Sequence, residues 1–115
     1  MSQFKKNLEC LPSIDHLARI EMVVDNQEEP LAIIENKPGK SGSLAVYHYL
    51  YNEFGRMSAE SAVKGLELFG EYTEEAKTSP GSHPNIDFLF KVIEAGDEYQ
   101  INLVERQPEN TKRGK

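Results

Sequence analysis

The loop that precedes Leu44 carries the residue types of an anion-binding turn. Gly39-Lys40-Ser41 has the ending of the phosphate-binding loop of nucleotide hydrolases, but position 34, where the full motif requires glycine, is isoleucine. A weaker interpretation survives, because backbone N–H groups at a helix start and nearby lysines attract a phosphate or a carboxylate. The alternative is an ordinary connection in which Ser43 caps the next helix. The residues that we predict to hold an anion are Lys37, Gly39, Lys40, Gly42 and Ser43.

The three histidines are the next candidates for chemistry. His16 follows Asp15, His48 lies in a tyrosine-rich segment, and His83 precedes a helix that carries Asp87 four positions later. None of them has a second histidine within four residues, and the chain has no Cys-x-x-Cys, so we predict no metal site and no cofactor. His16, His83 and Asp87 remain accessory candidates for the anion site. The alternative is that His83 and Asp87 simply belong to a helix N-terminus, where the dipole stabilises the carboxylate.

The sequence offers little for nucleophilic catalysis. Cys10, the single cysteine, is predicted near the end of a short helix beside Glu9, without an activating base, so we expect a small apolar packing residue. The nearest approach to a Gly-x-Ser-x-Gly elbow is residues 39–43, where the second glycine comes one position too early. We find no convergent pair of carboxylates. The sequence therefore predicts no catalytic residue.

Tyrosines gather at Tyr47, Tyr49 and Tyr51. On a helix Tyr47 and Tyr51 share a face while Tyr49 points away, so at least one ring should lie near the surface, as rings do at protein interfaces. Core packing is the expected role for two of the three. An exposed Tyr49 beside His48 would suit a homodimer contact.

Periodicity and turn residues predict the elements that must position these side chains. A spacing of three to four apolar residues indicates helices, and alternation indicates strands. The segment 44–54 is ambiguous between the two, and we choose helix. Gly65 and Gly70 either permit close packing of a neighbour or mark a bend. The expected elements are a helix over 3–11 stopped by Pro12, strands over 17–24 and 31–35 that form a hairpin, a helix over 44–54 ended by Gly55, a helix capped by Ser58, a helix from Pro84 to Gly96, and a strand over 98–103.

Strands that are separated from helices along the chain indicate an α+β fold. We expect a small antiparallel sheet, made of the N-terminal hairpin plus the C-terminal strand, packed against about three helices. A length of 115 residues corresponds to one domain, over 1–106. The segment 107–115 has no apolar residue and is expected to be a disordered polar tail.

Charge and composition limit the possible partners and the compartment. The chain has 13 Lys and Arg against 19 Asp and Glu, a formal net charge of -6, which argues against nucleic acid and anionic membranes as partners. No apolar stretch is long enough for a membrane span. A single cysteine is typical of a reducing compartment, so we expect a cytoplasmic protein.

Five segments together resemble a known family. They are 12–17 (PSIDHL), 34–39 (IENKPG), 42–47 (GSLAVY), 65–69 (GLELF) and 83–87 (HPNID). With them, the chain from about residue 4 to 105 is similar to a family of small bacterial proteins that is called a domain of unknown function. The resemblance implies a compact bacterial cytoplasmic protein and supplies no catalytic residues.

Two functions follow as expectations. The first is a non-enzymatic binding or interaction protein, self-associating as a homodimer or bound to another protein, because no catalytic set converges and the tyrosines are dense. The second is a protein that binds an anionic metabolite, a phosphate or a carboxylate, at residues 37–43, with possible chemistry from His83 or His16.

Overall fold

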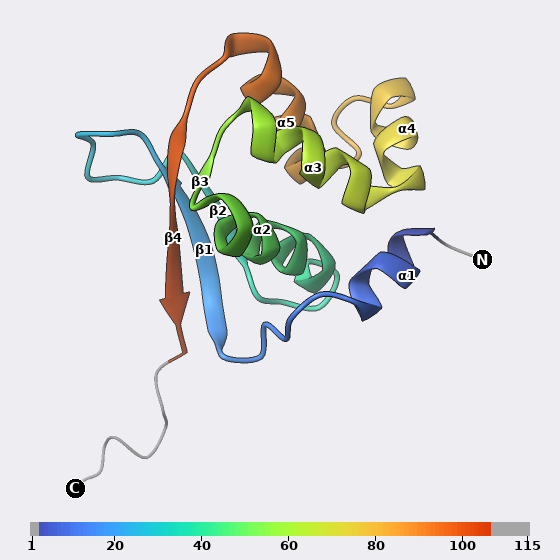
Figure 1. Cartoon of the computed structure of the whole chain (residues 1–115), viewed down its shortest axis with the longest axis horizontal. Coiled ribbons are helices and arrows are strands. Elements are labelled where there is room, and N and C mark those ends of the chain that lie inside the picture. The colour runs from blue at the N-terminus through green and yellow to red at the C-terminus, as the bar shows by residue number, and fades with distance from the viewer. Residues whose placement is uncertain (1–2, 107–115) are drawn as a thin grey trace, which may run out of the picture.

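The computed structural model describes residues 3–106, which form an antiparallel sheet with helices against one of its faces (Figure 1). In chain order the elements are α1 (Gln3–Glu9), β1 (Leu17–Val23), β2 (Ala32–Glu35), α2 (Ser41–Phe54), β3 (Arg56–Met57), α3 (Ala59–Phe69), α4 (Glu71–Thr78), α5 (Pro84–Ala95) and β4 (Tyr99–Glu105). The predicted α+β class is confirmed. The expected tail over 107–115 lies outside the described residues.

The sheet has the strand order β2-β1-β4-β3, and every neighbouring pair is antiparallel. Ile20 of β1 lies opposite Ile34 of β2 on one side and opposite Leu103 of β4 on the other. β3, in which Met57 lies opposite Tyr99 of β4, was not predicted from the sequence. A strand of two residues is too short to show alternation, so its pairing depends on the strand beside it.

An irregularity in β1 decides which of its residues reach the core. The register with β4 shifts between Leu17 and Arg19, which turns both Leu17 and Ile20 into the core although they are three residues apart. Strict alternation through Ile20 and Met22 would place Ala18 and Val24 on the buried face, and both are half-buried instead. A bulge changes the side-chain period locally, and the sequence alone did not reveal it.

The ambiguous segment 44–54 is helical and belongs to α2, which begins at Ser41. The sequence analysis placed the cap at Ser43, but Lys40 occupies the N-cap position and Ser43 lies inside the first turn. Gly55 ends the helix as predicted, with a φ of 82° that suits a residue without a Cβ.

Helix α3 begins as predicted at Ser58, whose hydroxyl forms a capping box with Ser61. Both expectations for its glycines hold. A Cβ on Gly65 would lie 2.8 Å from Leu89 Cδ1, so α5 packs against this position, and Gly70 is the bend that separates α3 from α4. The separate helix α4 was not predicted.

Helix α5 runs from Pro84 to Ala95 and ends at Gly96, as the sequence indicated. Within residues 3–106 the structure thus has five helices where about three were expected against the sheet, and the one that was not predicted, α4, arises because the chain bends at Gly70. Helix α2 contacts β1 and β2, while α3 and α5 pack on each other beyond it. The buried core consists of Leu17, Ile20, Met22, Ile34, Leu44, Val46, Tyr47, Leu50, Met57, Ala62, Phe69, Ala76, Ile86, Leu89, Val92 and Ile101.

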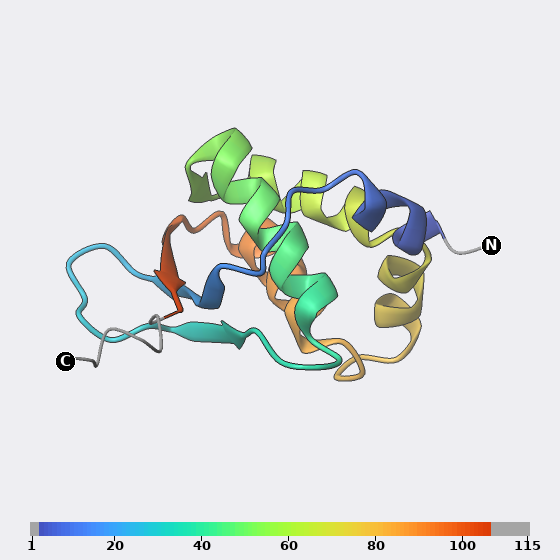
Figure 2. The ribbon, with the colours of Figure 1, turned by 90° about the horizontal axis from the view of Figure 1, so that it is seen from below.

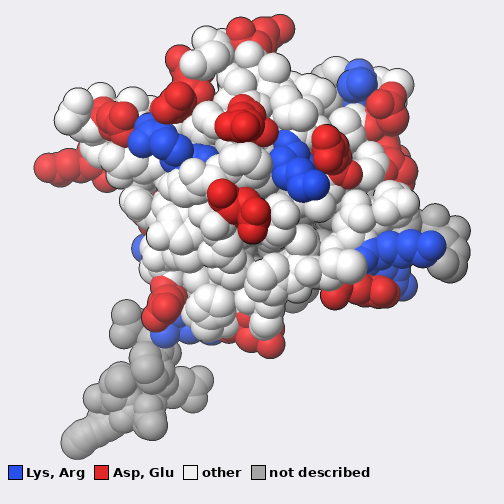
Figure 3. All heavy atoms as spheres, viewed as in Figure 1, with Lys and Arg blue, Asp and Glu red and all other residues white. Residues whose placement is uncertain are grey.

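Charges of both signs are mixed on the face drawn in Figure 3, where Lys and Arg lie among Asp and Glu without forming one large basic area. Among the described residues, no helix combines the length and the apolar character that a membrane crossing requires.

Candidate functional site

A cavity of about 640 Å³ lies where α1, the start of α2, the turn between α3 and α4, and the start of α5 meet. Figure 2 shows the loops that precede α2 and α5 side by side at this end of the molecule, next to α4. The volume is in the range of small-molecule sites. The cavity is lined by Phe4, Leu8, Ile33, Gly39, Lys40, Ser41, Gly42, Ser43, Phe69, Tyr72, Ser82, His83, Pro84, Asn85 and Ile86.

One wall of the cavity is the first turn of α2. The first backbone bond of this turn runs from the N–H of Leu44 to the carbonyl of Lys40 at 3.1 Å, so the three preceding N–H groups have no acceptor within the helix. No side chain caps this end, and its first turn contains no acidic residue. Within residues 3–106, the Lys40 ammonium has no ion pair. This wall therefore presents positive charge, which the Glu35 carboxylate offsets only from beyond ion-pair distance.

A second helix start faces the same cavity. His83 occupies the N-cap position of α5, makes no side-chain cap, and accepts the N–H groups of Ile86 and Asp87 through its carbonyl, each at 2.9 Å. The buried hydroxyl of Tyr47 donates to the Asn85 carbonyl at 2.5 Å and so ties α2 to this turn. Burial raises the pKa of Tyr47, which keeps the hydroxyl protonated as a donor. The positive ends of two helix dipoles thus point to one space, but Asp87 in the first turn of α5 partly offsets the second of them.

Another wall of the cavity is aromatic. Phe4 stacks on Phe69 with ring centroids 5.4 Å apart, and the edge of one ring meets the other between Phe4 and Tyr72 at 5.3 Å. Tyr72 in turn lies 5.3 Å from the ring of His83. These four rings form a continuous wall, which we call the aromatic wall.

The ring of His83 is oriented by Glu75 of α4. The side-chain atom Nε2 of His83 lies within hydrogen-bonding distance of Oε1 of Glu75. An ionised carboxylate can only accept, so Nε2 carries the proton in this contact and Nδ1 is left for another partner. Asp87 makes a different contact, in which it accepts the N–H of Gly81 at 2.9 Å.

The structure brings together most of the sequence candidates and separates the rest. Four of the five predicted anion residues line the cavity, but the fifth, Lys37, forms an ion pair with Glu35 at 2.9 Å. This contact lowers the pKa of Glu35, first through its hydrogen bond and then through the lysine charge. Of the accessory candidates, His83 lines the cavity, whereas His16 and Asp87 do not.

His16 instead lies beside His48, with ring centroids 5.5 Å apart and the edge of one ring toward the other. His48 is buried, and its Nδ1 has no hydrogen-bond partner in the described part of the chain. Burial, and then the nearby His16, lower the pKa of His48. Among residues 3–106, no group of three or more His, Cys, Asp or Glu is arranged to hold a metal ion.

The expectation for Cys10 was wrong. Its side chain is exposed and does not fill the core. α1 is a short helix with no buried residue, so the position after it also stays at the surface.

Sequence reasoning missed several residues of the site. A helix over 3–11 was expected, but nothing in the sequence showed that Phe4 and Leu8 of this helix cover the start of α2. Ser41 was assigned to the loop, and Tyr72 and Asn85 received no role. Tyr72 comes two residues after Gly70. The bend expected at Gly70 was the sequence signal that could have indicated a role for Tyr72.

The comparisons with known proteins agree with the resemblance. Residues 4–103 match the family described as "uncharacterized protein conserved in bacteria (DUF2322)". No curated protein and no solved structure matched the chain. Because the match covers most of the sequence, the chain belongs to this bacterial family.

Proposed function

We propose that this protein binds a small anionic molecule, with a carboxylate or phosphate group, in the cavity between α2, α4 and α5. The observation that supports this most is the convergence of two helix starts without side-chain caps on one cavity of about 640 Å³. Lys40 adds a positive charge without an ion pair in the described chain, and the N–H groups of α2 supply directed donors. An anion bound there would satisfy groups that the fold leaves without partners.

Titration with inorganic phosphate and with acetate tests this proposal. Amide signals of Gly42 and Ser43 should shift in heteronuclear NMR spectra, and Lys40→Ala should weaken binding about tenfold, since a charge-assisted contact contributes about 1.5 kcal/mol or more. Lys91→Ala is the matched control, because it removes the same charge from an exposed position of α5 outside the cavity. Absence of binding by both anions, or equal weakening by the two variants, contradicts the proposal.

A second proposal is self-association through the edge of the sheet. β2 is an edge strand, and two apolar side chains are exposed there: Leu31, just before β2, by 57%, and Ile33, within β2, by 50%. An unpaired apolar edge can add a strand from a second copy. The tyrosines support this less, because Tyr47 is buried, Tyr49 is half-buried and Tyr51 is 37% exposed.

Native mass spectrometry and light scattering at micromolar and millimolar concentration would test the dimer. Ile33→Lys should abolish it, because a charge would lie at the paired edge. Val63→Lys, at an apolar position that is 47% exposed on α3, should leave it intact. One chain mass at every concentration would refute self-association.

A further inference from the structure

We infer that the anion carries a flat aromatic ring, which lies against the aromatic wall while its charged group faces the first turn of α2. This inference rests on the proposed function and specifies the class of ligand. The inference depends on how the first turn of α2 and the aromatic wall are placed relative to one another.

The ring of Phe4 lies directly against the first turn of α2. A Cβ on Gly42 would be 2.9 Å from Cζ of Phe4, so this turn and the ring are already in contact. Phe4 is held there by two bonds from α1: its N–H donates to Oε1 of Glu71 at 3.0 Å, and Asn7 Nδ2 donates to the carbonyl of Leu68 at 2.9 Å. The charged end of a ligand and its apolar end would therefore occupy neighbouring parts of one cavity.

The apolar side of the cavity is made largely of rings. Phe4, Phe69 and Tyr72 all line it, and the first two stack with an angle of 20° between their planes. Stacked and edge-on ring contacts are more favourable than the same area of aliphatic contact. A planar ring on the ligand would extend this stack.

His83 connects the two halves of this site. Its ring lies 5.3 Å from Tyr72, and Glu75 accepts the hydrogen bond of Nε2, so Nδ1 is an acceptor in the neutral ring and donates to an anion only when the imidazole is protonated. It belongs to the N-cap residue of α5 and hence lies at the positive end of that helix. A carboxylate or phosphate attached directly to a ring, or one bond removed from it, would meet the ring stack and both helix starts together.

Four probes test the inference by dissociation constants measured calorimetrically or by NMR: acetate, benzoate, cyclohexanecarboxylate and phenyl phosphate, with inorganic phosphate as the reference for the last. We expect benzoate to bind about tenfold or more tightly than acetate, and phenyl phosphate similarly against phosphate, because a ring is buried. Cyclohexanecarboxylate should fall between acetate and benzoate. The carboxylate and phosphate series together identify which charged group the site prefers.

Tyr72→Leu and Phe4→Leu should each reduce the ratio of benzoate to acetate affinity and the ratio of phenyl phosphate to phosphate affinity. Phe88→Leu is the control, because the ring of Phe88 contacts that of Tyr99, with the two planes tilted by 42°, outside the cavity. In the unaltered protein, nuclear Overhauser contacts between benzoate and the rings of Phe4 and Tyr72 give a readout that needs no variant.

The outcomes separate the two proposals. If acetate and phosphate bind but the ring adds nothing, or if cyclohexanecarboxylate equals benzoate, the inference about the ring is refuted and the anion site stands. If no probe binds, both proposals fail. A ring gain that persists in Tyr72→Leu but disappears in Phe88→Leu would place the ring elsewhere and refute this inference.

Discussion

The start of α2 and the start of α3 differ in whether side chains of the protein satisfy the backbone groups that have no partner within the helix. At α3, Ser61 Oγ accepts the N–H of Ser58 at 2.7 Å and lies 3.0 Å from the carbonyl of Arg56, so the exposed backbone groups are satisfied by the chain itself. At α2, neither a cap nor an acidic side chain does this. The two starts therefore differ in whether the fold leaves anything for a ligand to complete.

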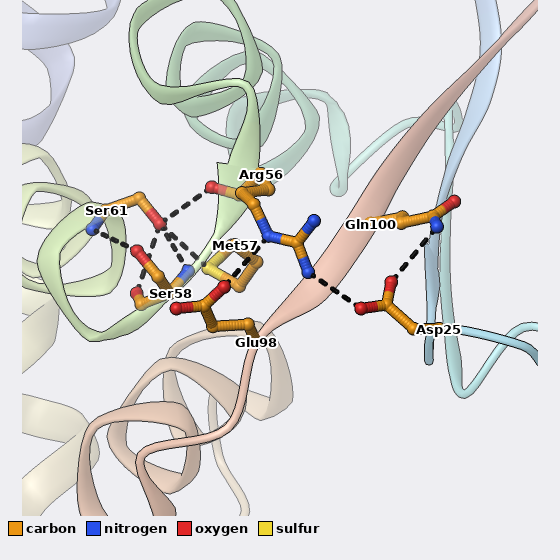
Figure 4. Close-up of polar contacts among 7 residues, drawn as sticks. All are labelled: Asp25, Arg56, Met57, Ser58, Ser61, Glu98 and Gln100. Atoms are coloured by element: carbon orange, nitrogen blue, oxygen red, sulfur yellow. Dashed lines mark hydrogen bonds and ion pairs between the residues drawn. The ribbon is translucent and has the colours of Figure 1, made fainter.

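The surroundings of α3 extend the contrast (Figure 4). Arg56 forms ion pairs with Asp25 at 3.3 Å and with Glu98 at 3.1 Å, and Gln100 donates to Asp25 at 3.0 Å. These contacts join β3 to β4 and to the turn after β1. We call Asp25, Arg56, Glu98 and Gln100 the Arg56 cluster. Its charges are matched within the chain, whereas Lys40 at the cavity lacks an ion pair in residues 3–106.

Among the variants that test the difference between the two helix starts, Ser61→Ala should cause the largest loss of stability. Ser61 is fully buried, and its loss leaves a backbone N–H and a carbonyl without their side-chain partner, which costs about 1–3 kcal/mol of unfolding free energy. Urea denaturation measures the change. The control is Ser41→Ala, at an exposed serine in the first turn of α2, which should change stability by less than about 0.5 kcal/mol. Equal losses would remove the contrast.

Arg56→Met should cost less, about 1 kcal/mol or below, because its side chain is 37% exposed and solvent weakens both ion pairs. The loss should shrink at high salt, which screens exposed charges. Thermal unfolding at low and high salt checks both statements. Lys40→Met is the comparison variant, and a loss as large as that of Arg56→Met would show that Lys40 also has a stabilising partner.

Lys40→Asp should raise the stability of the free protein, whereas the variants above lower it. A lysine at a helix N-cap opposes the dipole, and an acidic residue there favours it, so the free protein should gain about 0.3–1 kcal/mol of stability. The same variant should lose phosphate and acetate binding. Unfolding free energies and titrations on one sample test this exchange. A variant that is less stable and still binds would mean that the start of α2 is not built for an anion.

The smallest effect that we expect is a dependence of stability on pH. It comes from His48, which lies midway along α2, between the helix start at the cavity and the Arg56 cluster. Burial and His16 hold its folded pKa below the ordinary value of 6.5, so the unfolded chain binds more protons near and below that value. The contribution of His48 to the free energy of unfolding is fully present above pH 6.5, and it is lost as the solution becomes more acidic. The effect is small because a single imidazole is involved.

Melting temperatures between about pH 7.5 and about pH 5 measure this dependence. Carboxylates also titrate in acid, so the comparison with His16→Asn is needed. That variant should lose less stability over the same interval, since one cause of the lowered pKa of His48 is gone while the burial remains. An unchanged pH dependence in His16→Asn would exclude the coupling between the two rings.

Much of the fold could be predicted because its signals are local. Ser58 as a cap, Gly55 and Gly96 as helix ends and Pro84 as a helix start each depend on contacts within about four residues. The alternation in 17–24 and 98–103 likewise indicated strands before any partner was known. The family resemblance has the same origin, since it was visible in short segments.

The sequence by itself therefore determined the class of fold and the main helices, and it predicted the loop at 39–43 as a place for an anion. The tertiary structure decided that Phe4, Gly42, Tyr72 and His83 share one cavity, that two-residue β3 pairs with β4, and that Lys37 is taken up by Glu35. These outcomes depend on contacts between residues far apart along the chain, or on competition between neighbouring charges. Local propensity carries no information about either, because the free energy of such contacts exists only once the distant segments have packed together.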